Sequence, residues 1–380
     1  MAELFEEIRS YRDEEVNDTI TKLMKQYNVS HALGVFFPGQ DINELLSSIH
    51  SVYDFQHKLM YPIFVNHIKP TFSEMTCSGV EHLDPKKPYL FISNHRDIVL
   101  DSALLNYYLH EAGIPTAEIA IGDNLLDRDW IKELVRLNKS FIVKRGLNNI
   151  EMLKSSRHLS KYIHHTILEK KHSVWIAQRS GRAKDGNDET YRGLINMLYM
   201  SSNNGIIEHF KSLNIVPVTI SYEFDPCDGR KTNELYRDSL HGDYVKAANE
   251  DVESIKMGIV LPKGKGHLHF GKVINERIGA LSSLDRKGEM ITHICSEIDR
   301  QIQENYKLWP SNYAAHELRK NLDTTNGFSK EERDQFSKRM NEALAKLDGD
   351  KSKLRDIFLS MYEFPLLNKQ KWANISSPVT

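Results

Sequence analysis

A histidine followed by two aspartates is the group of residues in this sequence best suited to catalysis. His95 lies in the stretch 89–105, with Asp97 two residues and Asp101 six residues further along the chain. A carboxylate on one ring nitrogen fixes the tautomer of an imidazole and stabilises its cationic form, so the other nitrogen can accept a proton from a hydroxyl group. We therefore predict that His95 is a general base, oriented by either Asp97 or Asp101.

The residues around His95 predict the elements that must position it. The apolar run 89–92 is typical of a buried strand, Ser93 and Asn94 interrupt it, and residues 98–105 indicate a helix. This order puts His95 at the carboxyl end of a strand, where open α/β sheets bind their ligands. The start of the helix adds free backbone N–H groups that favour an anion.

Basic side chains follow two other predicted strands. The strands end near residues 143 and 177, and the basic residues after them are Lys144, Arg145, Arg179, Arg182 and Lys184. The planar guanidinium of arginine binds phosphate oxygens in pairs. Glycines such as Gly181 allow backbone N–H groups to approach an anion. Residues 174–188 are therefore predicted to cradle a phosphate.

Strand and helix patterns alternate through the middle of the chain, which favours an α/β sheet covered by helices. The predicted strands are 89–93, 118–121, 141–144, 173–177, 215–222 and 267–274. We predict a helical region over 1–75, the α/β domain over 76–305 and a second helical region over 306–380. In that last region, Ser329 and Glu332 form a capping-box signature, Pro365 is predicted to end a helix, and 369–380 is predicted to be a loose tail.

Four blocks of the sequence resemble the motifs of the glycerolipid acyltransferases, the family of glycerol-3-phosphate and 1-acylglycerol-3-phosphate acyltransferases. The first is Asn94-His95 with Asp101, although five residues separate His and Asp here where the family has four, which predicts a bulge in the turn. The second is 141–146 and the third 174–188. The fourth is 214–226, with Pro217. The likeness covers about residues 85–275.

The third block departs from the family pattern, which has Glu-Gly, a short spacer, Arg, Ser and Arg. Gly181 and Arg182 match, but Ser180 or Gln178 stands at the Glu position. Two alternatives therefore stay open. One is an acyltransferase for another lyso-lipid or an amino-lipid acceptor, and the other is a catalytically degenerate member that binds a membrane or a carrier protein.

The resemblance implies an acyltransferase-type mixed sheet with helical additions at both ends. It also implies transfer of a fatty acyl group from acyl-coenzyme A or an acyl carrier protein to a hydroxyl of glycerol-3-phosphate or 1-acylglycerol-3-phosphate, in phospholipid biosynthesis. His95 would be the base and Asp101 its partner, with no metal and no cofactor. The candidate substrate-binding residues are Asn94, Arg96, Lys144, Arg145, Arg179, Gly181, Arg182, Lys184 and Pro217.

Composition limits the partners and the location. The 380 residues carry 50 basic and 52 acidic side chains, a net charge of −2, which disfavours a nucleic-acid binder. Three scattered cysteines indicate a reducing compartment, and no apolar run reaches 18 residues. His267 and His269 lack a third metal ligand. We expect a cytoplasmic protein, peripheral on the inner face of the membrane, that binds a thioester donor or carrier protein and a phosphate-bearing acceptor.

Overall fold

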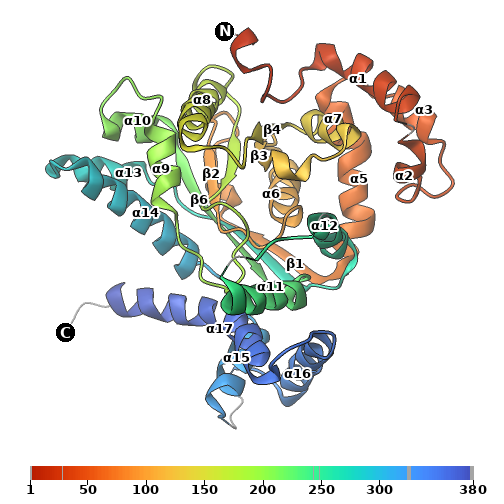
Figure 1. The fold of residues 1–380 in the computed structure, drawn as a ribbon. Helices are drawn as coiled ribbons and strands as arrows, with labels where there is room; N and C mark the ends of the chain where they lie inside the picture. Colours follow the sequence, from red (N-terminus) through yellow and green to blue (C-terminus); the bar gives the residue numbers. More distant parts are fainter. Residues whose placement is uncertain (1, 28, 243, 248, 323–326, 377–380) are drawn as a thin grey trace.

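A seven-stranded sheet forms the centre of the protein in this computed structural model, which describes residues 2–27, 29–242, 244–247, 249–322 and 327–376 (Figure 1). The strands are β1 Phe72–Ser78, β2 Leu90–Ser93, β3 Glu118–Gly122, β4 Ser140–Val143, β5 Val174–Ala177, β6 Ile215–Tyr222 and β7 Gly264–Phe270. Their order across the sheet is β1-β7-β6-β2-β5-β3-β4. The predicted mixed α/β sheet is confirmed.

The directions of the strands decide which loops meet. Strands β2 to β6 are parallel to one another, whereas β7 runs antiparallel to β6 and β1 runs parallel to β7. Ser93 pairs with Ala177 of β5 on one side and with Val218 of β6 on the other. The loops after β2, β3, β4 and β5 therefore leave from the same edge of the sheet.

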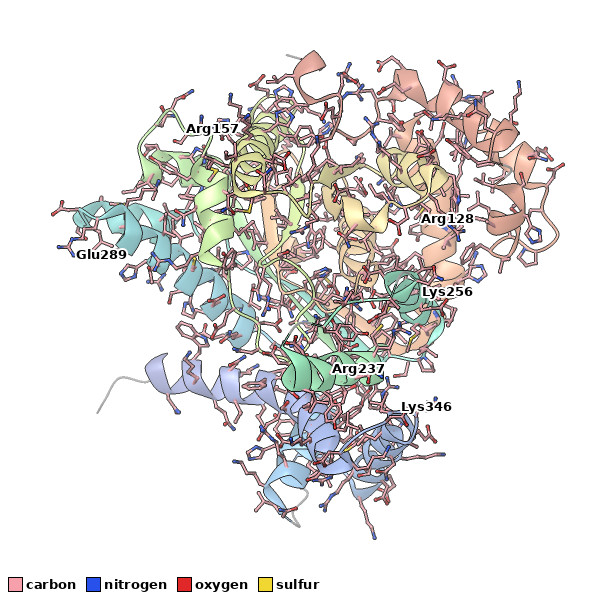
Figure 2. All side chains as sticks on the ribbon, in the orientation of Figure 1. Arg128, Arg157, Arg237, Lys256, Glu289 and Lys346 are labelled. Carbon is pink, nitrogen blue, oxygen red and sulfur yellow. The ribbon has the colours of Figure 1, made fainter. Side chains whose placement is uncertain are left out.

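Helices cover both faces of the sheet. Those in this part of the chain are α6 Leu100–Glu111, α7 Asp129–Leu137, α8 Asn149–Leu168, α9 Arg192–Tyr199, α10 Ile206–Ser212, α11 Asp228–His241, α12 Glu250–Val260, α13 Asn275–Gly279 and α14 Lys287–Glu304. Side chains of α8, α9 and α14 pack on one face, and those of α6 pack on the other. In Figure 2, labelled charged residues such as Arg157 and Lys346 lie at opposite ends of the molecule.

Helices also make up most of the first 71 residues. They are η1 Ala2–Phe5, α1 Asp13–Lys25, α2 Ser30–Gly34, α3 Ile42–Ser47, α4 Val52–Asp54, η2 Phe55–Met60, α5 Tyr61–Ile63, η3 Phe64–Ile68 and η4 Lys69–Thr71. Their apolar side chains form a cluster with Leu137 of α7. Strand β1 was not predicted, because its residues alternate only weakly in polarity. It crosses the predicted domain boundary at residue 75.

The C-terminal helices are α15 Pro310–Lys320, α16 Lys330–Ala345 and α17 Lys351–Ser376, which gather at one end of the molecule (Figure 1). The capping box of Ser329 and Glu332 is confirmed. The predicted stop at Pro365 is wrong, because α17 continues to Ser376. Proline removes the donor for the carbonyl of Met361, and that carbonyl lies against Gly186, where a Cβ would approach its oxygen to 2.2 Å.

The tail predicted over 369–380 is therefore helical as far as residue 376, and residues 377–380 lie outside the described part of the chain. Within the described ranges, no helix combines the length and the apolar character needed to cross a bilayer.

Candidate active site

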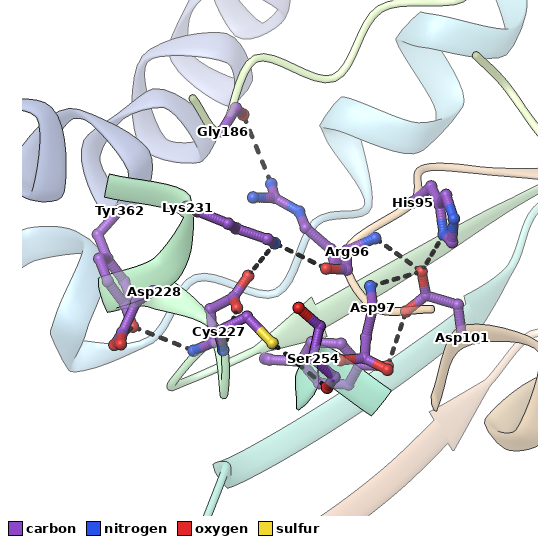
Figure 3. Close-up of polar contacts among 12 residues, drawn as sticks. His95, Arg96, Asp97, Asp101, Gly186, Cys227, Asp228, Lys231, Ser254 and Tyr362 are labelled. Atoms are coloured by element: carbon purple, nitrogen blue, oxygen red, sulfur yellow. Dashed lines mark hydrogen bonds and ion pairs between the residues drawn. The ribbon is translucent and has the colours of Figure 1, made fainter. Parts of the chain in front are cut away.

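The turn after β2 holds His95 against the carboxylate of Asp101 (Figure 3). Asp101 Oδ2 lies 2.7 Å from His95 Nδ1 and also accepts the backbone N–H groups of Arg96 at 2.6 Å and Asp97 at 3.0 Å. Its Oδ1 accepts the hydroxyl of Tyr222 at 2.8 Å. Burial and the Asp101 charge raise the pKa of Tyr222 well above its usual value, so the phenol stays a donor. Asp101 is fully buried and its hydrogen bonds fix its orientation.

The opposite side of the His95 ring is available. Its Nε2 has no hydrogen bond to the residues that the structure describes, and the side chain keeps 15% of its surface exposed. The ring stands edge-on to Trp175 with centroids 5.8 Å apart. The arrangement can therefore take a proton at Nε2 while Nδ1 stays on the carboxylate.

Asp97, the rival partner, does not touch the imidazole ring. Its Oδ1 accepts the backbone N–H groups of Val99 at 2.9 Å and Leu100 at 3.0 Å, at the start of α6. Helix α6 thus begins two residues later than predicted, after a turn at 98–99 that accommodates the five residues between His95 and Asp101. Burial, together with the Asp101 charge, raises the pKa of Asp97.

Asn94 and Arg96, on either side of the histidine, both face the protein interior. The Asn94 side chain exchanges two hydrogen bonds with the backbone of Ile220 in β6, at 2.9 and 2.8 Å. The Arg96 guanidinium pairs with Asp188 and lies over the ring of Tyr306. Burial disfavours the charged form of Arg96, but the Asp188 carboxylate outweighs it and raises the pKa of the guanidinium. In the structure, both side chains hold the turn.

Contacts join the loops after β4 and β5 to the turn after β2. Arg145 Nη1 donates to Ser180 Oγ at 2.6 Å, and its backbone N–H donates to Asp123 at 2.9 Å. The backbone N–H of Ala183 donates to the carbonyl of His95 at 2.8 Å. Lys144, by contrast, pairs with Glu7 at 2.7 Å, away from these contacts. Partial burial lowers the pKa of Arg145 from its usual value.

The basic residues of the third block have different surroundings. Arg179 has no hydrogen bond or ion pair within the described ranges and is half-buried. Arg182 is only 8% exposed, and its Nη1 is buried without a partner in the described chain. Lys184 pairs with Glu234 of α11. Gly181 has a φ of +77° and open space around it, which a glycine tolerates at no steric cost.

Helix α12 covers this loop. Asp251 Oδ1 lies 3.9 Å from Arg182 Nη2 and 2.7 Å from Lys246 Nζ, and its Oδ2 accepts the Asn124 amide at 3.4 Å. Gly258 brings the backbone of α12 against Asp97, whose Oδ2 would be 2.7 Å from a Cβ there. No sequence pattern connects α12 with the site, because residues 250–260 carry no motif.

Pro217 pairs with Ile92 inside the sheet, and its carbonyl accepts the N–H of Gly271 at 2.8 Å. This position in a central strand is structural. The histidines His267 and His269 bond to Thr76 and Ser78, and burial first, then Lys307, lowers the pKa of His267 to about 4. No group of three metal-ligating side chains occurs in the part of the chain that the structure describes.

A buried polar network beside the turn was missed by the sequence analysis. It comprises Asp188, Asp225, Asp228, Lys231, Tyr306, Arg339 and Tyr362. A cavity with room for about one water molecule lies between Arg96 and the tyrosines Tyr222, Tyr306 and Tyr362. In the sequence, this network is indicated only by the two aspartates that follow β6, Asp225 and Asp228, and acidic residues after a strand are common.

One comparison with known proteins, that with family models, agrees with the motifs. The family model described as Acyltransferase matches residues 74–221. No curated protein matches the chain significantly. A solved structure, the 1-acyl-sn-glycerophosphate (LPA) acyltransferase PlsC from Thermotoga maritima, is 11% identical, with a TM-score of 0.35 over 75% of this chain and 93% of that chain. Residues 74–221 therefore match an acyltransferase family, in agreement with the resemblance of the sequence blocks to acyltransferase motifs.

Proposed function

We propose that this protein transfers a fatty acyl group from a thioester, acyl-coenzyme A or acyl carrier protein, to a hydroxyl of glycerol-3-phosphate or 1-acylglycerol-3-phosphate. One observation carries the proposal. His95 Nδ1 lies 2.7 Å from the carboxylate of the buried Asp101, while His95 Nε2 has no hydrogen-bond partner among the described residues. A base positioned in this way accelerates proton removal by about 10²–10⁴-fold.

The proposed reaction runs in two steps at one carbonyl carbon. His95 Nε2 takes the hydroxyl proton while the hydroxyl oxygen forms a bond to the thioester carbon. The tetrahedral intermediate then collapses, the carbon–sulfur bond breaks, and the leaving thiolate takes the proton from His95. Asp101 stabilises the imidazolium between the two steps, because its charge lies on Nδ1. The protein forms no covalent bond to the acyl group.

Arginines on two neighbouring loops are the proposed phosphate ligands. Arg145 reaches the third block through Ser180, Arg179 has no partner among the described residues, and Arg182 has an unpaired Nη1. A buried guanidinium N–H without an acceptor is costly, so an anionic ligand is favoured there. Lys144 and Arg96 are not part of this proposed phosphate site, because each is already paired.

We further propose that the protein meets the cytoplasmic face of the membrane through the start of α8. Ile150, Met152 and Leu153 are 69%, 53% and 54% exposed, so three large apolar side chains at the start of α8 face solvent beside the polar Asn149 and Glu151. Lys154 and Arg157 of the same helix are exposed and suit anionic headgroups, and Figure 2 labels Arg157. Because α8 follows β4, this turn lies at the edge of the sheet that carries His95.

One observation favours a second acceptor class. Asp251 lies beside Arg182, and no Glu stands in the third block to pair with the arginines. An amino-lipid acceptor is the alternative substrate, and its amine would have to displace Lys246, which pairs with Asp251 at 2.7 Å.

The test is a panel of acceptors with a labelled acyl donor. Wild-type protein is incubated with acyl-coenzyme A or acyl carrier protein and with glycerol-3-phosphate, lysophosphatidate or an amino-lipid, beside His95→Ala. We expect product from a phosphate-bearing acceptor with the wild type and a loss of about 10²–10⁴-fold with His95→Ala at unchanged folding. A wild type that is inactive with every acceptor would contradict the proposal and favour a binding protein.

A further inference from the structure

A fully buried lysine contacts the backbone next to His95. Lys231 of α11 is 2% exposed, donates from Nζ to the carbonyl oxygen of Arg96 at 2.7 Å and pairs with Asp225 (Figure 3). A buried ammonium is retained only where it is paired and hydrogen-bonded. Lys231 lies outside the residues that match the acyltransferase family, and the proposed chemistry does not use it.

The carbonyl that Lys231 holds belongs to a peptide unit that also supports Asp101. The carbonyl of Arg96 and the N–H of Asp97 form one planar group whose two ends point in opposite directions. Its oxygen accepts from Lys231, and its N–H donates to Asp101 Oδ2 at 3.0 Å. The same Oδ2 holds His95 Nδ1. Rotation of this peptide would therefore release Asp101 and the ring together.

The C-terminal helices hold the partner of Lys231. Tyr362 of α17 accepts the backbone N–H of Asp225 at 3.0 Å, and Arg339 of α16 donates to the Asp225 carbonyl at 2.7 Å. Both side chains also bind Asp228, at the start of α11, at 2.8 and 2.6 Å. A continuous set of hydrogen bonds thus connects helices beyond residue 330 to the turn that carries His95.

We infer that Lys231 is a positioning residue, which fixes the Arg96–Asp97 peptide so that Asp101 meets His95, and that α16 and α17 are needed to complete the active site. The inference rests on the proposed function for the role of His95 as a base, but the fixing of the turn is measurable without activity. Lys231 raises kcat without contacting substrate, so it leaves the KM of donor and acceptor unchanged.

The test replaces Lys231 and Asp225 together, because Lys231→Met alone would leave the Asp225 carboxylate as an unpaired buried charge. In Lys231→Met/Asp225→Asn, the Asn oxygen still accepts the Cys227 N–H that Oδ1 accepts at 2.8 Å. Asp225→Asn alone keeps the Lys231 contact with Arg96 but leaves the ammonium without its ion pair, so the melting temperature of this variant measures the cost of that buried charge. Lys231→Gln is added for the case in which the double variant melts below the assay temperature.

A matched pair at the other edge of the sheet controls for stability. Glu118 begins β3, is fully buried and pairs with Lys170. Because β3 is parallel to β5 and β5 to β2, this amino end lies opposite His95. Lys170→Met/Glu118→Gln therefore removes an ion pair with a buried carboxylate without touching the turn.

Two readouts are compared in all variants. In the Lys231 double variant we expect kcat to fall about 100-fold, as a displaced catalytic group produces, with KM unchanged. We expect the backbone amides of residues 93–101 to exchange their hydrogens with solvent about tenfold faster or more, because hydrogen bonds to a charged group are lost. The Glu118 pair should leave both quantities near their wild-type values.

The outcomes separate this inference from the proposed function. Unchanged exchange over 93–101 in the Lys231 double variant would overturn the inference whatever the activity. An equal fall of kcat in the Glu118 pair would also overturn it, because a general loss of stability would then explain the effect. Faster exchange in a protein whose wild type transfers no acyl group would support the fixing of the turn and contradict the proposed function alone.

Discussion

Replacing Asp101 by asparagine removes one negative charge and leaves the shape of the side chain unchanged. Oδ2 accepts two backbone N–H groups besides the imidazole, whereas the one partner of Oδ1 among the described residues is the hydroxyl of Tyr222. The amide oxygen of Asn must therefore take the place of Oδ2, because an NH₂ group there would oppose two donors. The NH₂ group then faces Tyr222, whose oxygen can accept from it. His95 Nδ1 keeps an acceptor, and its tautomer is preserved.

The expected loss follows from this geometry. A hydrogen bond to a charged group contributes about 1.5–3 kcal/mol, and a neutral one contributes about 0.5–1.5 kcal/mol. The difference of about 1–2 kcal/mol corresponds to a fall of about 5- to 30-fold in kcat. In the Ser-His-Asp triad, the same substitution costs about 10⁴-fold because it imposes the wrong tautomer. The two backbone donors to Oδ2 make the loss smaller here.

The matched control is the same substitution four residues earlier in the chain. Asp97 contacts the backbone at the start of α6 through Oδ1 alone, and its buried Oδ2 has no partner among the described residues. Burial raises the pKa of Asp97, so the loss of its charge matters less. We expect Asp97→Asn to keep kcat close to that of the wild type.

The assay follows release of the donor thiol with a chromogenic disulfide, at a saturating concentration of acceptor, after melting curves show that both variants are folded. Three results would refute the reasoning. They are an unchanged kcat in Asp101→Asn, a loss of about 10⁴-fold in that variant, and equal losses in the two variants. The last result would mean that Asp97 supports the ring as much as Asp101 does.

Two further predictions concern the acceptor and the membrane. Arg145→Ala should raise the KM of a phosphate-bearing acceptor about 10- to 100-fold, because a charged hydrogen bond is lost. Lys144→Ala should leave this KM unchanged, because Lys144 pairs with Glu7. Both KM values are obtained from initial rates against acceptor concentration, and equal effects of the two substitutions would contradict the proposed phosphate site. Ile150→Ser/Leu153→Ser should weaken co-sedimentation with anionic vesicles about tenfold or more and leave transfer to soluble glycerol-3-phosphate unchanged. Unaltered vesicle binding would exclude the start of α8 as the membrane contact.

The sequence predicted the sheet well because its central strands are continuous apolar runs with breaks at both ends. Strands β2 and β6 are buried on every residue, and a strand buried on both faces needs no alternation. Strand β1 at the sheet edge has a mixed pattern and was missed. Pro365 misled the prediction because tertiary contacts support α17 before the proline, in the cluster around Phe358, and after it, at the buried Leu366 and at Trp372, which donates to Gln303.

The candidate site was predictable only where chemistry depends on neighbours in the chain. His95, Asp97 and Asp101 lie within seven residues, but only the structure shows that Asp97 bonds to the backbone of 99 and 100 while Asp101 meets the ring. Lys231 could not be found, because a lysine that binds a backbone carbonyl 135 residues away leaves no local pattern. The resemblance to a family supplied the role of the arginine loops, which spacing alone leaves open.

The structure suggests why residues outside the family match are present. The acyltransferase region ends at residue 221, one residue before Tyr222, which donates to Asp101. Lys231 follows and contacts the same turn, while Asp225 pairs with Lys231 and is itself held by the C-terminal helices. We therefore expect a truncation after residue 305 to disturb the turn itself as well as the stability of the protein.

The most direct test of the account is acyl transfer by purified protein with and without the imidazole. Wild type and His95→Ala are compared with labelled acyl thioester and glycerol-3-phosphate or lysophosphatidate, and folding of both is checked by thermal melting. The account predicts ester formation by the wild type and its loss by at least about 10²-fold in a folded His95→Ala. Ester formation at the same rate in both proteins would contradict it.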